Sequence, residues 1–250
     1  MKFTIITVVK NDKKNLLTSL KSAISQKCEN FEHIIYDGIS NDGTKHVIKK
    51  YLSKNIRYIQ QNDQNYYDGL NKAIKIAKGD YIGILNAGDQ YVNSIVLKKI
   101  FKKILISKCD LLFGNLEYLS KKNKISRVWK YPVKTLNKFT ALKIASPTLF
   151  IKKKILLSNL YKIKYNISSD TDFNLTISKK NYKFIYYNMN MIYMKGGGLS
   201  TNKKFFLKKM KQDLEILFKH FNLFGPIIYL YKISFKLRSL FFFNIDPNKK

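Results

Sequence analysis

The chain has 250 residues, enough for one large domain or for a core domain with a short appendage. It carries 47 Lys and Arg against 16 Asp and Glu, a formal net charge of +31, and 45% of its residues are hydrophobic, including 17 Phe and 17 Tyr. This apolar and aromatic content excludes a disordered basic protein, because disordered chains are poor in such residues.

The positive charge is concentrated after residue 100. The first hundred residues have a net charge of +7 and the remaining 150 a net charge of +24. Only three basic residues are arginine, and no helix-turn-helix or arginine-rich segment is visible. Arginine supplies many of the contacts by which proteins recognise nucleic acids. A basic nucleic-acid-binding protein is therefore an alternative interpretation, but no nucleic acid partner is expected; phosphorylated molecules and lipid headgroups fit the charge better.

Cysteines and hydrophobic runs give information on the compartment. Cys28 and Cys109 have neither disulfide-framework nor zinc-ligand spacing, and no secretory signal is recognisable. No apolar run approaches the roughly 20 residues of a spanning helix. We therefore expect a cytoplasmic chain that does not cross a membrane.

The first hundred residues alternate between strand and helix patterns. Phe3–Val9 is a β-branched run typical of a buried parallel strand. Three more strands are expected at His33–Tyr36, Ile56–Ile59 and Tyr81–Leu85. Helices are expected after Asn11-Asp12, from Thr44, over Asp68–Lys78 and over Asn93–Ile106. Four such βα units predict an α/β fold with a mostly parallel sheet and helices on both faces.

The pattern is less regular after residue 110. A β pair is expected from Leu111–Leu119 and Ile125–Tyr131. Two short strands (Thr148–Ile151 and Phe184–Tyr187) and one helix (Phe173–Lys179) follow. The segment Lys203–Phe243 has a helical pattern with a break at Gly225-Pro226.

Acidic residues follow the expected strands. Asp37, Asp63, Asp68 and Asp89 each lie at or just past the carboxyl end of a strand. Ligands of open parallel sheets bind at this edge. Carboxylates there can bind a nucleoside, hold a divalent cation or accept a proton. The alternative is that these residues only form turns and helix caps.

The sequence lacks the characteristic motifs of several enzyme classes. Val8-Val9-Lys10-Asn11 carries no glycine-rich phosphate loop, which argues against nicotinamide dehydrogenases, P-loop ATPases and nucleotidyltransferases. The three histidines have no zinc spacing, and no G-x-S-x-G motif is present.

Six segments in order resemble motifs of the family 2 glycosyltransferases, especially the bacterial enzymes that make cell-surface polysaccharides such as colanic acid and O-antigen. They are FTIITVVKND (3–12), YDGISNDGT (36–44), DQNYYDGLNK (63–72), GDYIGILNAGD (79–89), SDTDF (169–173) and GGGLS (196–200). The resemblance covers residues 1–202. It implies a GT-A domain, with a Rossmann-like, mostly parallel sheet flanked by helices, followed by a basic amphipathic helical tail at 203–250.

The resemblance also implies an activity. Such an enzyme moves a sugar from a nucleotide-diphosphate sugar, with a UDP-sugar favoured, to a hydroxyl of a glycan or lipid-linked acceptor. Inversion at the sugar carbon and a role in surface polysaccharide biosynthesis are expected. A catalytically inactive GT-A-like scaffold is the main alternative, because the metal motif of the family is incomplete here.

Site residues follow from the same motifs. The residues expected to bind the donor are Asp37, Asp42, Asp68, Asn71, Lys72 and Asn86. The family's D-x-D metal motif reads Asn86-Ala87-Gly88 here, which leaves Asp89 as the metal ligand. We expect Mg²⁺ or Mn²⁺ to bind, with a weak or dispensable requirement, because the diphosphate and water can supply the other ligands.

The general base is expected in the segment S-D-T-D-F. Asp170 is the first candidate and Asp172 the second, because an inverting transfer needs one carboxylate to take the acceptor's proton. Asp170 could instead cap the helix that follows.

Gly196, Gly197 and Gly198 are expected to form a loop that closes over the substrates, or else a simple turn. Trp129 and Tyr131 are candidates for stacking on a sugar, and the alternative is that Trp129 only packs in the core.

The tail combines an apolar stripe with lysines. An apolar stripe beside several lysines consists of Phe205, Phe206, Leu207, Met210, Leu214, Leu217, Phe218 and Phe221, and a second apolar run follows Pro226. A basic amphipathic helix of this kind suits peripheral contact with the inner face of a membrane. The alternative is that the stripe packs on the catalytic domain.

Overall fold

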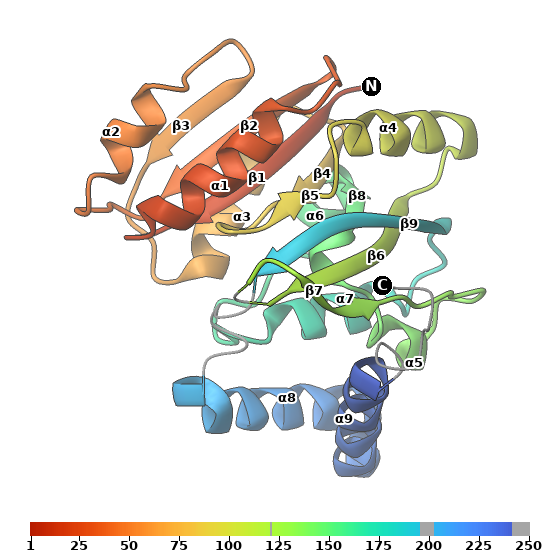
Figure 1. The fold of residues 1–250 in the computed structure, drawn as a ribbon. Helices are drawn as coiled ribbons and strands as arrows, with labels where there is room; N and C mark the ends of the chain where they lie inside the picture. Colours follow the sequence, from red (N-terminus) through yellow and green to blue (C-terminus); the bar gives the residue numbers. More distant parts are fainter. Residues whose placement is uncertain (121, 196–202, 242–250) are drawn as a thin grey trace.

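One twisted sheet with helices on both faces forms the body of the structure, a computed structural model that describes residues 1–120, 122–195 and 203–241 (Figure 1). In this part of the chain the sheet has nine strands. Their bounds are β1 Phe3–Val9, β2 Phe31–Asp37, β3 Ile56–Gln60, β4 Tyr81–Ile84, β5 Gln90–Tyr91, β6 Leu111–Leu119, β7 Ile125–Trp129, β8 Phe150–Lys152 and β9 Phe184–Lys195.

The strand order is β3-β2-β1-β4-β8-β6-β9-β5, with β7 paired to β6. The first four strands in this order are parallel, as the alternating βα pattern predicts. β8 runs antiparallel to both β4 and β6, whereas β9 is parallel to β6. The carboxyl ends of β1, β2, β3 and β4 therefore meet at one edge, where the acidic residues were expected.

Helices cover both faces of the sheet because side chains of a strand alternate. Phe3, Ile5 and Val9 of β1 pack on the side of α1, α2 and α4, while Ile6 and Val8 pack on the side of α3, α6 and α7. The helix bounds are α1 Lys13–Ile24, α2 Thr44–Lys49, α3 Tyr66–Ile76, α4 Val96–Ser107, α5 Lys138–Ala141, α6 Lys153–Ser158, α7 Ser169–Ile177, α8 Phe206–Phe221 and α9 Gly225–Phe241.

Most expected elements are confirmed, and the differences have local causes. β8 begins at Phe150 because Ser146–Thr148 forms a 3-10 turn. β9 has 12 residues, although only Phe184–Tyr187 was expected to be extended. The two-residue strand β5 and the short helices α5 and α6 were not expected, since each is too short for a periodic pattern to develop.

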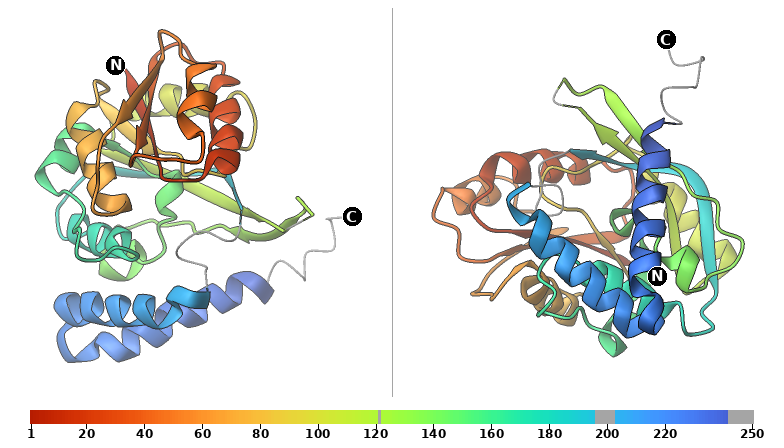
Figure 2. Two further views of the ribbon diagram at one scale, coloured as in Figure 1. Left: turned by 90° about the vertical axis from the view of Figure 1, so that its left-hand side faces the viewer. Right: turned by 90° about the horizontal axis from the view of Figure 1, so that it is seen from below.

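The tail forms two helices that lie against the body as a separate layer (Figure 2). α8 and α9 are separated at Asn222–Phe224, next to the expected break. Ile216, Leu217 and Ile228 are buried against Tyr165 and Leu175 of the body. The apolar stripe of the tail therefore packs, at least on its inner side, on α7 and the segment before it. Within the described residues, no helix is both long and apolar enough to span a bilayer.

Candidate active site

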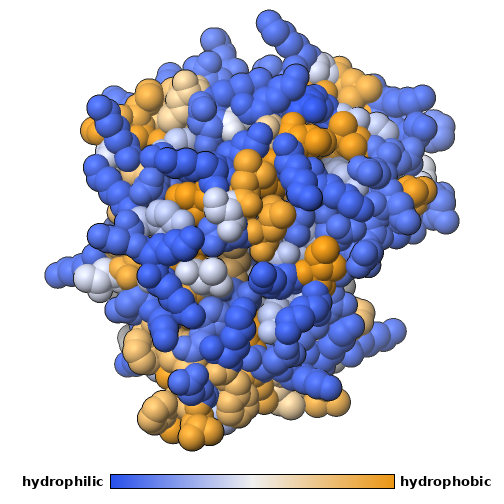
Figure 3. All heavy atoms as spheres, turned by 180° about the vertical axis from the view of Figure 1, so that it is seen from behind, coloured by the Kyte–Doolittle hydropathy of each residue, from blue (hydrophilic) through white to orange (hydrophobic). Residues whose placement is uncertain are grey.

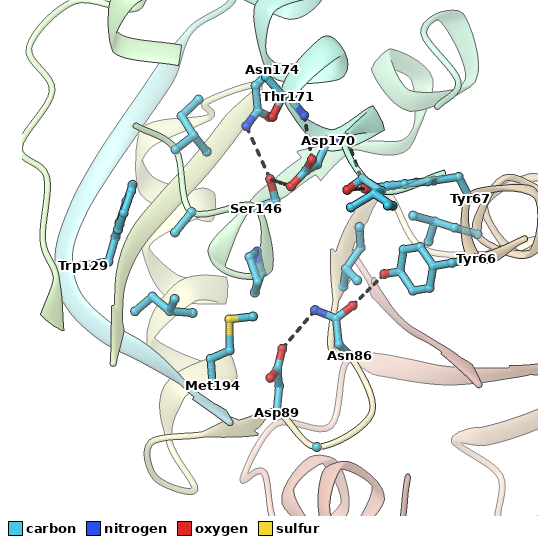
Figure 4. Close-up of a pocket in the computed structure, with 18 of the residues that line it drawn as sticks. Tyr66, Tyr67, Asn86, Asp89, Trp129, Ser146, Asp170, Thr171, Asn174 and Met194 are labelled. Carbon is cyan, nitrogen blue, oxygen red and sulfur yellow. Dashed lines mark hydrogen bonds between the residues drawn. The ribbon is translucent and has the colours of Figure 1, made fainter. Parts of the chain in front are cut away.

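A cavity of about 730 Å³ lies where the carboxyl ends of β1 and β4 face α7 (Figure 4), and residues of the tail also line it. Its wall combines Val8 of β1, Asn86 and Asp89 after β4, and Asp170 of α7. Three of the candidate site residues, Asn86, Asp89 and Asp170, thus share one cavity although they are far apart in the sequence.

Asp89 lies at one side of the cavity in a short chain of hydrogen bonds. Tyr66 Oη donates to Asn86 Oδ1 (2.6 Å), and Asn86 Nδ2 donates to Asp89 Oδ2 (3.0 Å). The Asp89 side chain is almost fully buried. Burial raises the pKa of Asp89 to about 7, against the opposing effect of hydrogen bonds from Asn86 and the Lys195 backbone. Near neutral pH this carboxyl group can therefore exchange a proton or accept a cation.

Asp170 faces Asp89 across the cavity (Figure 4). It lies in the first turn of α7, where the positive end of the helix dipole favours a carboxylate. Its backbone N–H donates to Tyr67 Oη (3.3 Å), and its Oδ1 accepts from the Thr171 N–H (2.8 Å). Ser146 Oγ lies 3.5 Å from Oδ2. These contacts hold the carboxylate at the cavity wall, where it can accept a proton from a bound hydroxyl.

Asp172 lies on the same helix but is absent from the cavity lining. It is buried, and its Oδ1 lies 2.6 Å from Lys219 Nζ and 2.8 Å from His220 Nε2 of α8. Burial acts to raise the pKa of Asp172, but hydrogen bonds from His220 and Lys219 outweigh it and the pKa is lowered. In this structure Asp172 joins α7 to the tail.

The first expected donor-binding segment lies outside the cavity lining. The Asp37 carboxylate accepts hydrogen bonds from Ser40 N (2.8 Å) and Tyr58 Oη (2.7 Å). Asp42 accepts from the backbone N–H groups of Lys13 (2.9 Å) and Thr44 (3.0 Å), which fixes the starts of α1 and α2. Both carboxylates order the loops at the sheet edge.

Gly38, the neighbour of Asp37, has no room for a side chain. A Cβ atom built here would lie 2.3 Å from Asp63 Oδ2. The carboxylate of Asp63 therefore occupies the space that a side chain at position 38 would need.

The second donor-binding segment belongs to α3. Asp68 forms an ion pair with Lys72 (2.9 Å), and Lys72 Nζ also donates to the Asn62 carbonyl (2.8 Å). Asn71 exchanges two hydrogen bonds with the Tyr161 backbone (2.8 and 3.0 Å). None of these three residues lines the cavity. The expected loop residues Gly196, Gly197 and Gly198 lie outside the described residues.

Several cavity residues were not expected as site residues. Tyr66 and Tyr67 stand inside the motif DQNYYDGLNK, but only its charged and amide residues were selected. Lys209, Lys232 and Lys236 come from the tail. The i,i+4 spacing of Lys232 and Lys236 places both on one helical face, a signal that could have grouped them. Trp129, one of the two stacking candidates, does line the cavity.

The residues present fit a divalent cation that arrives with a diphosphate. Among the described residues, no three His, Cys, Asp or Glu side chains gather into a site that could enclose a metal. Asp89 can supply one carboxylate ligand. Asn86 Oδ1 already accepts a hydrogen bond from Tyr66 and is therefore not free to bind a metal. Mg²⁺ commonly takes one or two carboxylates together with phosphate oxygens and water. Asp89 alone therefore suffices as the protein ligand only when the phosphate oxygens of the substrate and water supply the remaining ligands of the cation.

Residues 4–161 match the family model described as Glycosyl transferase family 2. An uncharacterized glycosyltransferase of Methanocaldococcus jannaschii is 31% identical over 190 residues, which are 72% of this chain and 65% of that protein. A UDP-Glc:alpha-D-GlcNAc-diphosphoundecaprenol beta-1,3-glucosyltransferase of Escherichia coli is 33% identical over 132 residues, 52% of this chain and 51% of that protein. The chain thus spans about half to two thirds of the length of these relatives.

The fold has a solved counterpart. The crystal structure of S. aureus TarS 1-349 in complex with UDP-GlcNAc superimposes with a TM-score of 0.73 at 18% identity, over 95% of this chain and 73% of that chain. At this identity the likeness shows a shared architecture, including the part of the chain beyond residue 161.

Proposed function

Because this chain belongs to glycosyl transferase family 2, we propose that it transfers a sugar from a nucleotide-diphosphate sugar, preferably a UDP-sugar, to an acceptor hydroxyl with inversion. The observation that carries this proposal is the pair of carboxyl groups, Asp89 and Asp170, which face each other across one cavity at the carboxyl edge of the sheet. The family resemblance assigns these two positions to the diphosphate side and to the base.

Asp170 is the proposed general base. A carboxylate held at the cavity wall takes the proton from the acceptor hydroxyl while that oxygen attacks the sugar carbon. The nucleoside diphosphate leaves from the opposite face of the sugar. A positioned base of this kind accelerates a reaction roughly 10²–10⁴-fold. Alignment of the two substrates in one cavity contributes further by converting an encounter into a reaction between bound groups.

The donor is proposed to bind along the edge that runs from Asp37 to Asp89. Asp37, Asp42, Asp68, Asn71 and Lys72 order the segments of this edge and remain the proposed donor-binding set. Asn86 and Asp89 then lie at the diphosphate. Mg²⁺ or Mn²⁺ would be held there by Asp89 and would neutralise charge on the departing diphosphate, with a weak requirement because one carboxylate holds it.

The acceptor is proposed to be a glycan or a lipid-linked sugar of surface polysaccharide biosynthesis. The name of the E. coli relative specifies a sugar linked to diphosphoundecaprenol as its acceptor. An acceptor of this class is confined to a membrane. We accordingly propose that the chain works at the cytoplasmic face of the membrane and touches it through the outer side of the tail.

The test is a screen of the purified chain against nucleotide sugars, with and without Mn²⁺, followed by Asp170→Asn and Asp172→Asn. We expect binding and slow hydrolysis of at least one UDP-sugar. Asp170→Asn should lose at least 100-fold in kcat with unchanged donor affinity, whereas Asp172→Asn should keep its kcat per folded molecule. Donor binding without any turnover would favour the inactive scaffold, and full activity of both variants would exclude this choice of base.

A further inference from the structure

Three lysines of the tail form part of the cavity wall beside Asp170. Lys209 belongs to α8, and Lys232 and Lys236 belong to α9. Lys232 Nζ donates to Thr171 Oγ1 (3.0 Å), and Lys209 Nζ lies 3.4 Å from Ser168 Oγ. The cluster thus contacts residues on either side of Asp170. It lies beyond the part of the chain that the family model matches.

The positive charge of this cluster is only partly balanced. Asp213 of α8 forms ion pairs with Lys209 (3.2 Å) and Lys232 (3.1 Å). In the described ranges 1–120, 122–195 and 203–241, the Lys236 ammonium has neither an ion pair nor a hydrogen bond. Burial together with Lys232 and Lys209 lowers the pKa of Lys236 to about 8, against the opposing effect of Asp213 and Asp170. The three cations therefore share one ion-paired carboxylate, Asp213, and the nearby charge of Asp170 also favours the charged forms of Lys232 and Lys236.

An unbalanced cation inside a cavity is unfavourable until an anion joins it. Lys232 is only 8% exposed and Lys236 is half-buried, so water can solvate neither ammonium fully. Removing an ammonium group from water costs free energy. A charge-assisted hydrogen bond to an anion offsets this desolvation cost. A phosphate oxygen would supply such bonds to two lysines one helical turn apart.

We propose that Lys232 and Lys236, with Lys209 behind them, bind a phosphate or diphosphate group of the acceptor substrate. This inference rests on the proposed function and names the acceptor class: a sugar joined to a phosphate. Nearness to Asp170 decides between acceptor and donor. The lysines contact Ser168 and Thr171, two residues before and one residue after the proposed base, whereas the donor diphosphate is assigned to Asn86 and Asp89 on the other side of the cavity.

The binding test uses inorganic pyrophosphate as the probe and the full chain saturated with UDP. Saturation fills the donor side, so that any further pyrophosphate must bind elsewhere. Calorimetric titration should show one site, weakened at least 10-fold in the double variant Lys232→Gln, Lys236→Gln. The matched control is Lys208→Gln, Arg238→Gln, which removes two charges from exposed positions of the same helices and should leave pyrophosphate affinity within twofold.

Lys232→Gln also removes an ion-pair partner of Asp213 and could weaken the fold. A second variant therefore separates a loss of pyrophosphate binding from a loss of folding. Lys236→Met removes an ammonium that has no described partner, and we expect a higher melting temperature together with weaker pyrophosphate binding. With a sugar-phosphate acceptor, the KM for the acceptor should rise while the KM for the donor stays constant.

Three outcomes would overturn the inference: no pyrophosphate binding to the UDP-saturated chain, equal losses in the control, or a loss of UDP affinity in the lysine variants, which would assign the cluster to the donor. A chain that binds neither UDP nor a UDP-sugar would instead contradict the proposed function, so the two failures are distinguishable.

Discussion

At the scale of single residues, Asp89 shows how the pKa of one carboxyl group is set when the other acidic residues of its motif are absent. Asn86 and Gly88 stand where relatives are expected to carry further carboxylates, so the buried Asp89 is the carboxyl group left at this turn. Its pKa of about 7 arises mainly from burial. Between about pH 4 and pH 7 the native state holds a proton on Asp89 that the unfolded chain, with an ordinary pKa near 4, has already released.

A pH dependence of stability follows with a definite sign. The raised pKa leaves stability unaffected below about pH 4 and lowers it progressively between about pH 4 and 7, by up to about 4 kcal/mol. Asp89→Asn should therefore stabilise the apoprotein at pH 8 and have little effect at pH 4. Thermal unfolding of variant and wild type in matched buffers checks this. A stabilisation that is equal at both pH values would show that Asp89 does not titrate as described.

Residue types and motifs identified Asp89 and Asp170 of the cavity but not their surroundings. Asn86, Asp89 and Asp170 could be selected from the sequence because they stand in recognisable segments. Whether Asp170 or Asp172 faces the cavity depends on the rotation of α7, and that rotation depends on Lys219 and His220 of a helix outside the motifs. A sequence pattern cannot supply that contact.

At the scale of elements, the buried Asp213 connects the two tail helices. Burial acts to raise the pKa of Asp213, but Lys232 of α9 and Lys209 of α8 outweigh it and hold the pKa at about 2. A lowered pKa of this kind stabilises the fold above about pH 4, and the contribution disappears as the pH falls towards 2. The pairing of α8 with α9 therefore depends on this carboxylate near neutral pH.

Asp213→Asn is predicted to destabilise the chain at pH 7 by about 3–5 kcal/mol, because it leaves buried ammonium groups without their counter-charge. Urea unfolding followed by circular dichroism measures the loss. Glu215→Gln is the matched control on the same helix, since its partner Lys164 is exposed and the pair is screened by water. Equal midpoints for both variants would argue against a structural role for the buried pair.

β9 shows why an element can be longer than its sequence pattern. Asn188 and Asn190 interrupt the apolar run and favour an end to the strand after Tyr187. In the structure both asparagines contact Asn115 Nδ2 of β6 (3.2 and 3.1 Å), and Asn190 also donates to Glu117. Polar residues from distant strands satisfy one another, so the strand continues to Lys195. Long-range pairing of this kind is invisible to a local pattern.

At the scale of the whole molecule, the tail has two different sides. Its inner side packs on α7 and lines the cavity, while its outer side exposes Leu223, Phe224 and Ile227. Apolar side chains gather over the tail at the lower end of Figure 3. Lys208 and Lys211 are exposed on α8. Exposed apolar groups and exposed lysines on the same pair of helices suit an anionic bilayer surface.

Replacement of Leu223, Phe224 and Ile227 by serine is predicted to reduce co-sedimentation with vesicles that contain phosphatidylglycerol, by at least fivefold. The fold should persist because these side chains are already exposed. Leu105→Ser, Ile106→Ser on α4 is the control for a general loss of hydrophobic surface. Binding should also weaken with salt. If the triple variant and the control sediment equally, the tail surface is not the membrane contact.

The position of the small strand β5 determines when the site can form during synthesis of the chain. Asp89 stands immediately before Gln90–Tyr91, and these residues pair with Ile192 and Tyr193 of β9, about a hundred positions later in the chain. Contacts between such distant segments form late in folding, since a long loop must close first. A nascent chain that ends before β9 therefore has its parallel strands but lacks the partner that fixes Asp89. The proposed diphosphate side of the site therefore forms only when the sheet is complete.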